Sequence, residues 1–387
     1  MEHNKHNFSK VPTLRFNEFT TNWQSTTLKN VCEYRKIRRT TEKKNYVSTE
    51  NIMQNFQGVE RFISAEYISG DGFNKNDILM GNIRPYLKKV CFADFDGVCN
   101  ADVLVFNSKT INPKFLYYVL ANDNFINYVM SSVKGSKMPR GDKNFIMQYP
   151  LSLPSETEQL KISDFIGCLT KRIQVQNKII SKYETLIKGI IDCLLNKKED
   201  NYYTFKDLYL KAGEGGTPTT DNDSYYENGT IPFIKIDDLS QKYIKRNSDY
   251  ITYLGLEKSA AWLIPSNSVI FSNGATIGRI SINTYPIATK QGVLGIVPSP
   301  IVMTEYLYYY MKTTYFRGQV RRITVKGTMD CAYLKDLNSI ICHIPEINHQ
   351  EKRIALLTVL DEKIACERML LQKLKEQKKY LLSKMFI

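Results

Sequence analysis

Two long segments of the chain carry apolar side chains at the spacing of a coiled-coil helix. In both segments, apolar residues recur at steps that are mostly three and four. Such steps place the side chains along one stripe of an α-helix, which packs against a second helix in a coiled coil. The stripe residues are Ile162, Ile166, Leu169, Ile173, Ile180 and Ile187 in the first segment, and Leu357, Leu360, Ile364, Leu371, Leu374 and Leu381 in the second.

Each stripe skips one polar residue, Gln176 in the first segment and Glu367 in the second. A polar residue at such a position commonly fixes the register and the number of partner helices. The first helix follows Pro154 and spans about 40 residues, which makes it about 60 Å long and too long for the core of a small domain. We therefore predict that the two helices pair within the chain as an antiparallel coiled coil. The alternative is that each helix packs only against its own globular segment.

The two helical segments belong to a longer internal repeat. "PSETEQLKISDFIGCLTKRI" begins at position 154 and "PEINHQEKRIALLTVLDEKI" begins at position 345, an offset of 191 residues. The same offset aligns "FLYYVL" (115–120) with "YLYYYM" (306–311). A period this long gives each copy room for its own core. The predicted order is therefore globular segment, helix, globular segment, helix.

Each globular segment mixes short apolar runs with turn signals, which favours an α+β fold. In the second segment, "FIKI" and "SVIFS" are predicted strands and "TEYLYYYMKT" is a predicted short helix. The predicted fold class is thus α+β, with two similar globular domains joined by two long helices. The predicted boundaries are 1–150 for the first globular domain, 151–199 for the first helix, 200–341 for the second globular domain and 342–387 for the second helix.

The charge balance of the chain favours an anionic partner. Its 387 residues carry a formal net charge of +14, which is typical of proteins that bind nucleic acid or a membrane surface. The amino terminus is polar, and no apolar run approaches the ~20 residues of a membrane span. The eight cysteines show no C-x-x-C spacing. We therefore expect a cytoplasmic protein with reduced thiols and no membrane segment.

The sequence lacks the motifs of several common enzyme classes. The glycine-rich stretch "GEGGTPTT" has no G-K-[ST] of a phosphate-binding loop, and neither a dinucleotide-binding fingerprint nor a nucleophile elbow occurs. The chain has four histidines, and no cysteine stands at zinc-ligand spacing. We therefore predict no catalytic residue, no metal site and no cofactor bound by this chain.

Basic residues gather in loops of both globular segments, beside small polar residues and tyrosines. Lys and Arg neutralise phosphates, while hydroxyl and amide groups hydrogen-bond phosphates and base edges. Two similar basic modules on a rigid spacer would read two half-sites at a set separation. For any single lysine, simple solvation remains the alternative. The candidate DNA-binding residues are Arg84, Tyr86, Lys88, Lys134, Gly135, Ser136, Lys137 and Arg140 in the first segment, and Thr217, Asn273, Thr276, Arg279, Lys290, Arg322, Lys326 and Thr328 in the second.

Taken together, these motifs resemble the specificity (S) subunits of Type I restriction–modification systems over nearly the whole chain. "VPTLRFNEFTTNW" (11–23) is similar to the family's opening, and "GGTPTTDNDSYYENGTIPFIKIDDL" (215–239) resembles the start of many of its recognition domains. "DILMGNIRPYLKK" (77–89) and "SVIFSNGATIGRI" (268–280) resemble two common variants of another shared motif. "LPSETEQLKISDFIGCLTKRI" (153–173) resembles the family's first spacer helix.

The resemblance implies that each globular segment is a target-recognition domain for one half of a split, asymmetric site in double-stranded DNA. The helices would set the gap between the half-sites and dock two modification (methyltransferase) subunits, and restriction subunits in systems that also cleave. S-adenosylmethionine, ATP and magnesium would then lie on those partners, and this chain would be non-catalytic. The choice of bases depends on the geometry of the loops and on a few side chains in the groove.

One motif departs from the family's pattern. "ETEQ" (156–159) has an acid before its glutamine, whereas "NHQE" (348–351) has none. If that acid holds a methyltransferase subunit, the two docking sites are unequal. Two other functions stay open: a stand-alone two-domain DNA-binding regulator would bind its site tightly without a partner, and a structural coiled-coil adaptor would show no salt-dependent affinity for DNA.

Overall fold

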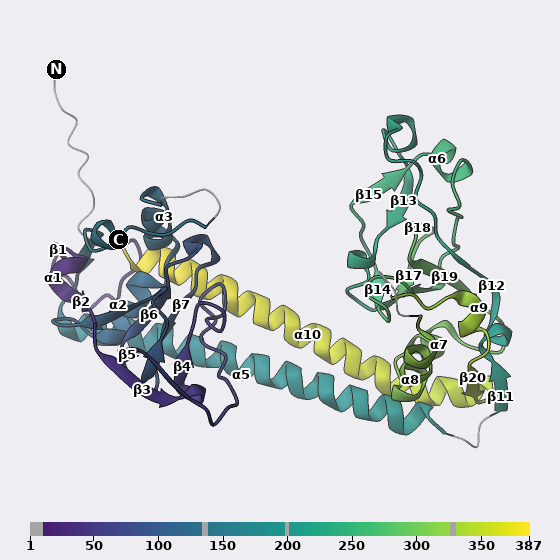
Figure 1. Ribbon diagram of the computed structural model, residues 1–387, viewed down its shortest axis with the longest axis horizontal. Coiled ribbons are helices and arrows are strands. Elements are labelled where there is room, and N and C mark those ends of the chain that lie inside the picture. Colours follow the sequence, from purple (N-terminus) through teal and green to yellow (C-terminus); the bar gives the residue numbers. More distant parts are fainter. Residues whose placement is uncertain (1–10, 134–137, 198–200, 326–329) are drawn as a thin grey trace. The chain divides into compact units, whose positions relative to one another are not determined.

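The computed structural model describes residues 11–133, 138–197, 201–325 and 330–387 (Figure 1). The chain forms two compact units. The first unit comprises residues 1–177 and 369–387, and the second unit comprises residues 178–368. Each unit therefore combines one globular segment with parts of both long helices. Both units mix helices with sheets, which confirms the predicted α+β class.

The first unit contains two four-stranded sheets and a two-stranded ribbon. One sheet has the antiparallel order β2 (Cys32–Tyr34), β9 (Val103–Ser108), β6 (Ile78–Gly81) and β7 (Val90–Phe92). The other has the order β3 (Arg38–Glu42), β5 (Tyr67–Phe73), β8 (Gly97–Cys99) and β4 (Tyr46–Val47). The antiparallel ribbon pairs β1 (Gln24–Thr27) with β10 (Pro150–Leu153). The short α-helices are α1 (Leu28–Val31), α2 (Pro113–Leu120), α3 (Asp123–Ser131) and α4 (Lys143–Ile146).

The second unit repeats this plan with a five-stranded and a three-stranded sheet. The larger sheet has the order β12 (Tyr209–Glu214), β19 (Val293–Pro298), β16 (Val269–Ser272), β17 (Ile280–Asn283) and β14 (Tyr243–Ile244). The smaller sheet has the order β15 (Asp249–Ile251), β13 (Ile231–Ile234) and β18 (Ala288–Thr289). The ribbon pairs β11 (Asn201–Thr204) with β20 (Ile341–Ile344). The short α-helices are α6 (Tyr253–Glu257), α7 (Thr304–Tyr310), α8 (Thr314–Ile323) and α9 (Leu334–Leu337).

The repeat of sequence is also a repeat of structure. The elements β6, α2, α3, α4 and β10 each have a counterpart that begins 191 residues later, namely β16, α7, α8, α9 and β20. Nearer the start of each copy the offset is smaller, because β11 begins only 177 residues after β1. The second unit thus has a longer chain between its first ribbon strand and β16, and this stretch includes β13, β14, β15 and α6.

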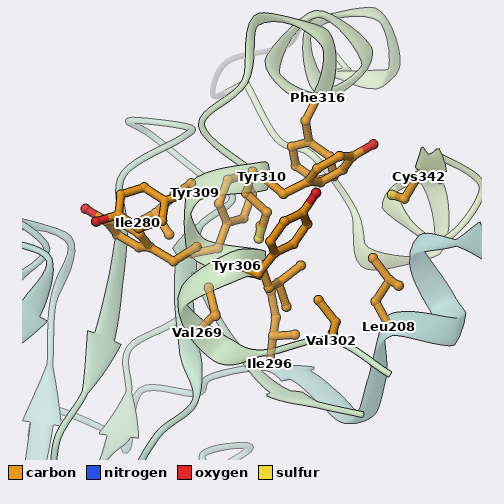
Figure 2. Close-up of a cluster of buried hydrophobic side chains, with 14 of the residues drawn as sticks. Leu208, Val269, Ile280, Ile296, Val302, Tyr306, Tyr309, Tyr310, Phe316 and Cys342 are labelled. Carbon is orange, nitrogen blue, oxygen red and sulfur yellow. The ribbon is translucent and has the colours of Figure 1, made fainter. Parts of the chain in front are cut away.

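The core of the second unit is built around the tyrosine-rich helix α7 (Figure 2). Tyr306, Tyr309 and Tyr310 lie on one side of this helix and are at most 1% exposed. The rings of Tyr306 and Tyr310 stack with centroids 6.3 Å apart. The Tyr310 hydroxyl accepts a hydrogen bond of 2.9 Å from the backbone N–H of His343, so its polar group is satisfied inside the core. The predicted short helix and the predicted strand "SVIFS" are confirmed, whereas only the first half of "FIKI" is strand, because β13 ends at Ile234.

The long helices are α5 (Glu156–Leu195) and α10 (Ile347–Met385). In the first unit, Ile162 and Ile166 near the start of α5 share one core with Leu381 and Met385 near the end of α10. This arrangement fits the predicted antiparallel pairing within the chain.

The second unit shows the converse pairing. Ile187 and Leu195 of α5 share a core with Leu357 and Ile364 of α10. All twelve predicted stripe residues are buried or half-buried. The pattern of steps therefore identified the faces of both helices that are turned away from solvent.

Candidate nucleic-acid interface

A repeated glutamine fixes each long helix to its globular segment. In the first unit, the Gln159 side chain accepts a hydrogen bond from the backbone N–H of Asn112 (3.0 Å) and donates one to the carbonyl of Pro154 (3.1 Å). Both groups lie at the ends of secondary-structure elements, because Asn112 caps helix α2 and Pro154 follows strand β10. The glutamine therefore joins the start of α5 to helix α2 of the globular segment.

The second unit has the same junction. Gln350 accepts from the backbone N–H of Met303 (2.8 Å) and donates to the carbonyl of Pro345 (2.8 Å). Both glutamines are at most 5% exposed, and Met303 stands 191 residues after Asn112. The repeated proline and glutamine thus have a structural role, which is to hold a buried helix end with satisfied hydrogen bonds.

The amino-terminal motif of the chain is held by the first long helix. Arg15 makes a two-pronged ion pair with Glu158, with Nε–Oε1 at 2.7 Å and Nη2–Oε2 at 2.8 Å. The indole N–H of Trp23 donates to the same carboxylate at 3.3 Å. Glu158 is fully buried, and hydrogen bonding to it raises the pKa of the Arg15 guanidinium. The arginine and the tryptophan of "VPTLRFNEFTTNW" therefore serve to pair one buried carboxylate.

This arrangement changes the interpretation of the acid that is present in "ETEQ" and missing from "NHQE". Glu158 is bonded within its own chain and is shielded from any partner, so the idea that it holds a methyltransferase subunit does not fit the structure. Its counterpart His349 is exposed. In the second unit the chain before β11 is the end of α5, so no arginine–tryptophan segment is present there to pair an acid.

In each globular segment, a buried asparagine fixes the loop that follows the central strand. Asn82 follows β6 and donates from its side chain to the carbonyl of Gly141 (3.2 Å). Its counterpart Asn273 follows β16, and its side-chain amide donates to the carbonyl of Ala332 at 3.4 Å, while its backbone carbonyl accepts from the N–H of Ala332 at 2.8 Å. Each asparagine joins the loop after the central strand to the chain just before α4 or α9. Asn273 is 0% exposed, so its side chain is turned away from solvent and supports the loop; its predicted contact with DNA stays a prediction.

In the first unit, the structure brings two predicted loops together. Arg84 and Tyr86 are exposed, and the backbone N–H of Arg84 donates to the carbonyl of Pro139 at 2.8 Å. Arg140 is also exposed and is paired with Asp102 at 2.9 Å. Lys88 is half-buried and paired with Asp123 at 2.7 Å. The predicted residues Lys134, Gly135, Ser136 and Lys137 lie outside the described residues.

In the second unit, two predicted cations flank one end of strand β13. The guanidinium of Arg279 donates hydrogen bonds to the carbonyl of Ile236 (3.1 Å) and to the carboxylate of Asp237 (2.9 Å). Lys290 is exposed, and its backbone N–H donates to the carbonyl of Ile234 at 2.9 Å. This end of the small sheet therefore places the predicted cations Arg279 and Lys290 beside the exposed acid Asp237.

The remaining predicted residues of the second unit are spread over other elements. Thr276 is exposed in the Arg279 loop, and Arg322 is exposed in the last turn of α8. The hydroxyl of Thr217 is buried and has no hydrogen-bond partner within the described part of the chain. Lys326 and Thr328 lie outside that part.

A lysine that also stands among the basic residues of this segment is structural. Lys242 donates to the hydroxyl of Tyr309 at 2.9 Å, and Tyr309 in turn donates to the carboxylate of Asp361 at 2.5 Å. Burial lowers the pKa of Lys242, against the opposing effect of Asp361. This chain of hydrogen bonds links α10 to α7, so Lys242 stabilises the domain and is not free to meet an anion.

Comparison with known proteins identifies the family. The sequence matches the Type I restriction modification DNA specificity domain twice, over residues 20–185 and 198–376. The chain therefore belongs to this family of non-catalytic specificity subunits. Within the described ranges, no helix combines the length and apolar character needed to cross a membrane, and no cluster of three or more His, Cys, Asp or Glu side chains suited to a metal is found there.

Curated relatives carry the same description. The chain is 26% identical over 216 residues to the EcoR124I/EcoR124II specificity subunit of Escherichia coli, covering 49% of this chain and 53% of that protein. It is 20% identical over 336 residues to the HindI specificity subunit of Haemophilus influenzae, covering 66% of this chain and 73% of that protein. The chain thus spans about half the length of the first of these relatives and about three quarters of the second.

Solved structures share the fold. The S subunit of M. genitalium superposes with a TM-score of 0.56 at 16% identity, covering 97% of this chain and 99% of that one. A chain from a structure of type I R-M complex assembly gives a TM-score of 0.61 at 16% identity, covering 95% and 98% of the two chains. At this identity the likeness establishes a common fold over the full length.

Proposed function

We propose that this chain is the DNA-recognition subunit of a Type I restriction–modification complex. Its two globular segments would each bind one half of a bipartite, asymmetric site in double-stranded DNA. The observation that carries the proposal is the duplicated architecture, in which two units present different loops on the same supports. The sequence after β6 is "NIRPYL", whereas the one after β16 is "NGATIG", so the two units would read different half-sites.

The cations in these loops are available to phosphates. Arg140 and Arg279 are paired with Asp102 and Asp237, but these pairs are exposed. Exposed ion pairs contribute little to stability, about 0 to 1 kcal/mol, so a phosphate can displace the acid at small cost. Arg84 is held by its backbone and extends into solvent. Such residues would supply the salt-dependent part of DNA affinity.

The long helices carry exposed apolar residues at repeated positions, which supports two docking surfaces. Phe165 is 44% exposed on α5, and Leu356, 191 residues later, is 48% exposed on α10. Three residues further along, Cys168 and Val359 are exposed as well. These pairs lie outside the coiled-coil stripe, and they stay exposed although the ring of Phe165 meets that of Phe16 edge-on with centroids 5.7 Å apart. Two equivalent surfaces would dock two copies of one partner, the methyltransferase subunit.

The partners would carry the chemistry. In this proposal S-adenosylmethionine, ATP and magnesium lie on the modification subunits, and on restriction subunits where the system also cleaves, and the complex works in the cytoplasm. This chain would supply the choice of DNA sequence and the positions of its partners, without a cofactor of its own.

The docking surfaces can be tested by introducing a charge at one site at a time. Phe165→Asp should remove one methyltransferase subunit from the complex, and Leu356→Asp should remove the other, because a buried carboxylate without a partner is costly. Native mass spectrometry of the co-expressed complex would show the loss of one copy in each case. Leu186→Asp is the matched control, since Leu186 is equally exposed on α5 but its repeat counterpart is the polar residue Gln377. A full complement of subunits in both docking variants would refute these surfaces.

The modular reading of DNA can be tested by exchange. Replacing residues 201–344, from strand β11 through strand β20, by the matching segment of a relative keeps the ribbon intact. We expect the methylated motif to change in one half only, because the first unit is untouched. A change in both halves, measured by methylation sequencing, would contradict independent recognition by two units.

A further inference from the structure

The second unit has a basic hollow that none of the predicted DNA-binding residues lines. Its volume is about 450 Å³, and it lies against the three-stranded sheet β15–β13–β18. No acidic residue takes part in its lining, which consists of Pro232, Lys245, Arg246, Asn247, Tyr250 and Tyr285. A second hollow of about 520 Å³ on the same unit is lined by Glu305 and by no basic residue. The smaller hollow is therefore the one suited to an anion.

The walls of this hollow are fixed by hydrogen bonds. The hydroxyl of Tyr285 donates to the side-chain oxygen of Asn247 at 2.9 Å, and the amide of Asn247 donates to the carbonyl of Asp249 at 2.7 Å. The floor is a cross-strand pair, because Pro232 of β13 stands opposite Tyr250 of β15. The shape of the hollow thus comes from the sheet and from the hydrogen-bonded turn at Asn247, and it does not need a ligand to form.

Its two cations are free to bind. Lys245 and Arg246 are both exposed, and no ion pair involves either of them within the described ranges. The nearby acid Asp249 is already paired with Lys235 at 2.7 Å. Tyr250 is 44% exposed, so its hydroxyl is accessible from solvent. Two unpaired cations beside a tyrosine hydroxyl form a suitable site for a phosphate group.

The position of the hollow on the sheet indicates which phosphate it would meet. Tyr285 precedes strand β18, and Lys290 follows the same strand. Five residues of chain span at most about 16 Å when fully extended, and only Ala288–Thr289 of this stretch is strand. The major groove of B-DNA is about 12 Å wide, so a duplex that meets Lys290 with one backbone has its other backbone within reach of the hollow.

We propose that this hollow binds a backbone phosphate of the DNA duplex on the far side of the groove from Lys290. The proposal rests on the recognition function proposed above and adds a sequence-independent contact to it. Because the contact is made to phosphate, it raises the affinity of the second unit for DNA without changing the sequence that is recognised.

The test is the salt dependence of DNA binding by the complete complex. The double variant Lys245→Ala with Arg246→Ala should lower the slope of log affinity against log salt by about 1 to 2 and weaken binding on the order of tenfold at moderate salt. The methylated motif should stay the same. The matched control is Lys206→Ala with Lys258→Ala, which removes the same charge from exposed sites outside the hollow and should leave the slope close to that of the wild type.

DNA probes with one uncharged backbone linkage make the test specific to one phosphate. Duplexes with single methylphosphonate substitutions across the half-site of the second unit should include one that weakens the wild-type complex but not the Lys245→Ala, Arg246→Ala complex. If the wild type binds its site and the double variant keeps the same slope and the same response to every probe, the hollow is not a phosphate site. If the wild-type complex shows no salt-dependent binding to DNA, the proposed recognition function fails and this inference fails with it.

Discussion

The Arg15→Met variant is expected to lose about 3 to 5 kcal/mol of stability in the first unit. Removal of the guanidinium leaves the Glu158 carboxylate buried at 0% exposure, and within the described residues its remaining hydrogen bond is the one of 3.3 Å from Trp23. A buried charge that loses its partner is far more costly than an exposed one. Urea unfolding can follow the first unit alone in a Trp262→Phe background, because the chain has only two tryptophans and Trp23 would then be the sole indole.

Two controls separate the buried charge from other effects. His349→Ala changes the position that corresponds to Glu158 in the second unit. The stability of that unit, followed by circular dichroism, should move by less than about 0.5 kcal/mol because the side chain is exposed. The double variant Arg15→Met with Glu158→Leu removes both charges and should recover most of the loss. If Arg15→Met unfolds at the same urea concentration as its parent, the ion pair does not hold the amino-terminal motif in place.

Insertion of one heptad into both long helices is expected to abolish methylation of the original motif and to create a motif with a longer gap. The insertions after Gln176 and Glu367 lie at or next to the boundary between the two units. Seven residues add about 10 Å of helix, which corresponds to about 3 base pairs of B-DNA at 3.4 Å each. A whole heptad keeps the stripe in phase, so the coiled-coil faces should still pack.

The control for this experiment is an insertion into one helix only. Without a matching insertion in the partner helix, the apolar stripes of the two helices no longer pair residue for residue on one side of the insertion. Methylation should then fall without a new motif appearing. Methylation sequencing of cells that carry each variant reads the gap directly. An unchanged gap in the double insertion would mean that the helices do not set the spacing of the half-sites.

The sequence was most informative where periodicity and repetition acted together. The steps of three and four in the long segments identified residues such as Ile166 and Leu357, which are fully buried. A helix repeats its environment every turn, so burial along it follows from local spacing. The repeat then supported each helix prediction with a second copy, because "FLYYVL" and "YLYYYM" occupy equivalent positions and should form equivalent helices, as α2 and α7 do.

The candidate site was less predictable, because it depends on contacts between distant parts of the chain. The partner of Glu158 is Arg15, 143 residues away, and no local pattern links the two. Asn273 stands among loop residues, yet it is buried against Ala332. Lys245 and Arg246 could be noted from the sequence as basic loop residues, but the hollow they line with Tyr250 and Tyr285 depends on the sheet. Loop residues of the same types thus divide into supports and exposed groups according to the tertiary fold.

The most direct test of the proposed function is a genome-wide profile of adenine methylation in host cells with and without this gene. The account predicts a split, asymmetric motif that is methylated on adenine only when the gene is present, and this result would also give the recognised sequence. In cells that express the cognate methyltransferase subunit, a profile that does not change on deletion of the gene would contradict the assignment of this chain as the subunit that selects the DNA site.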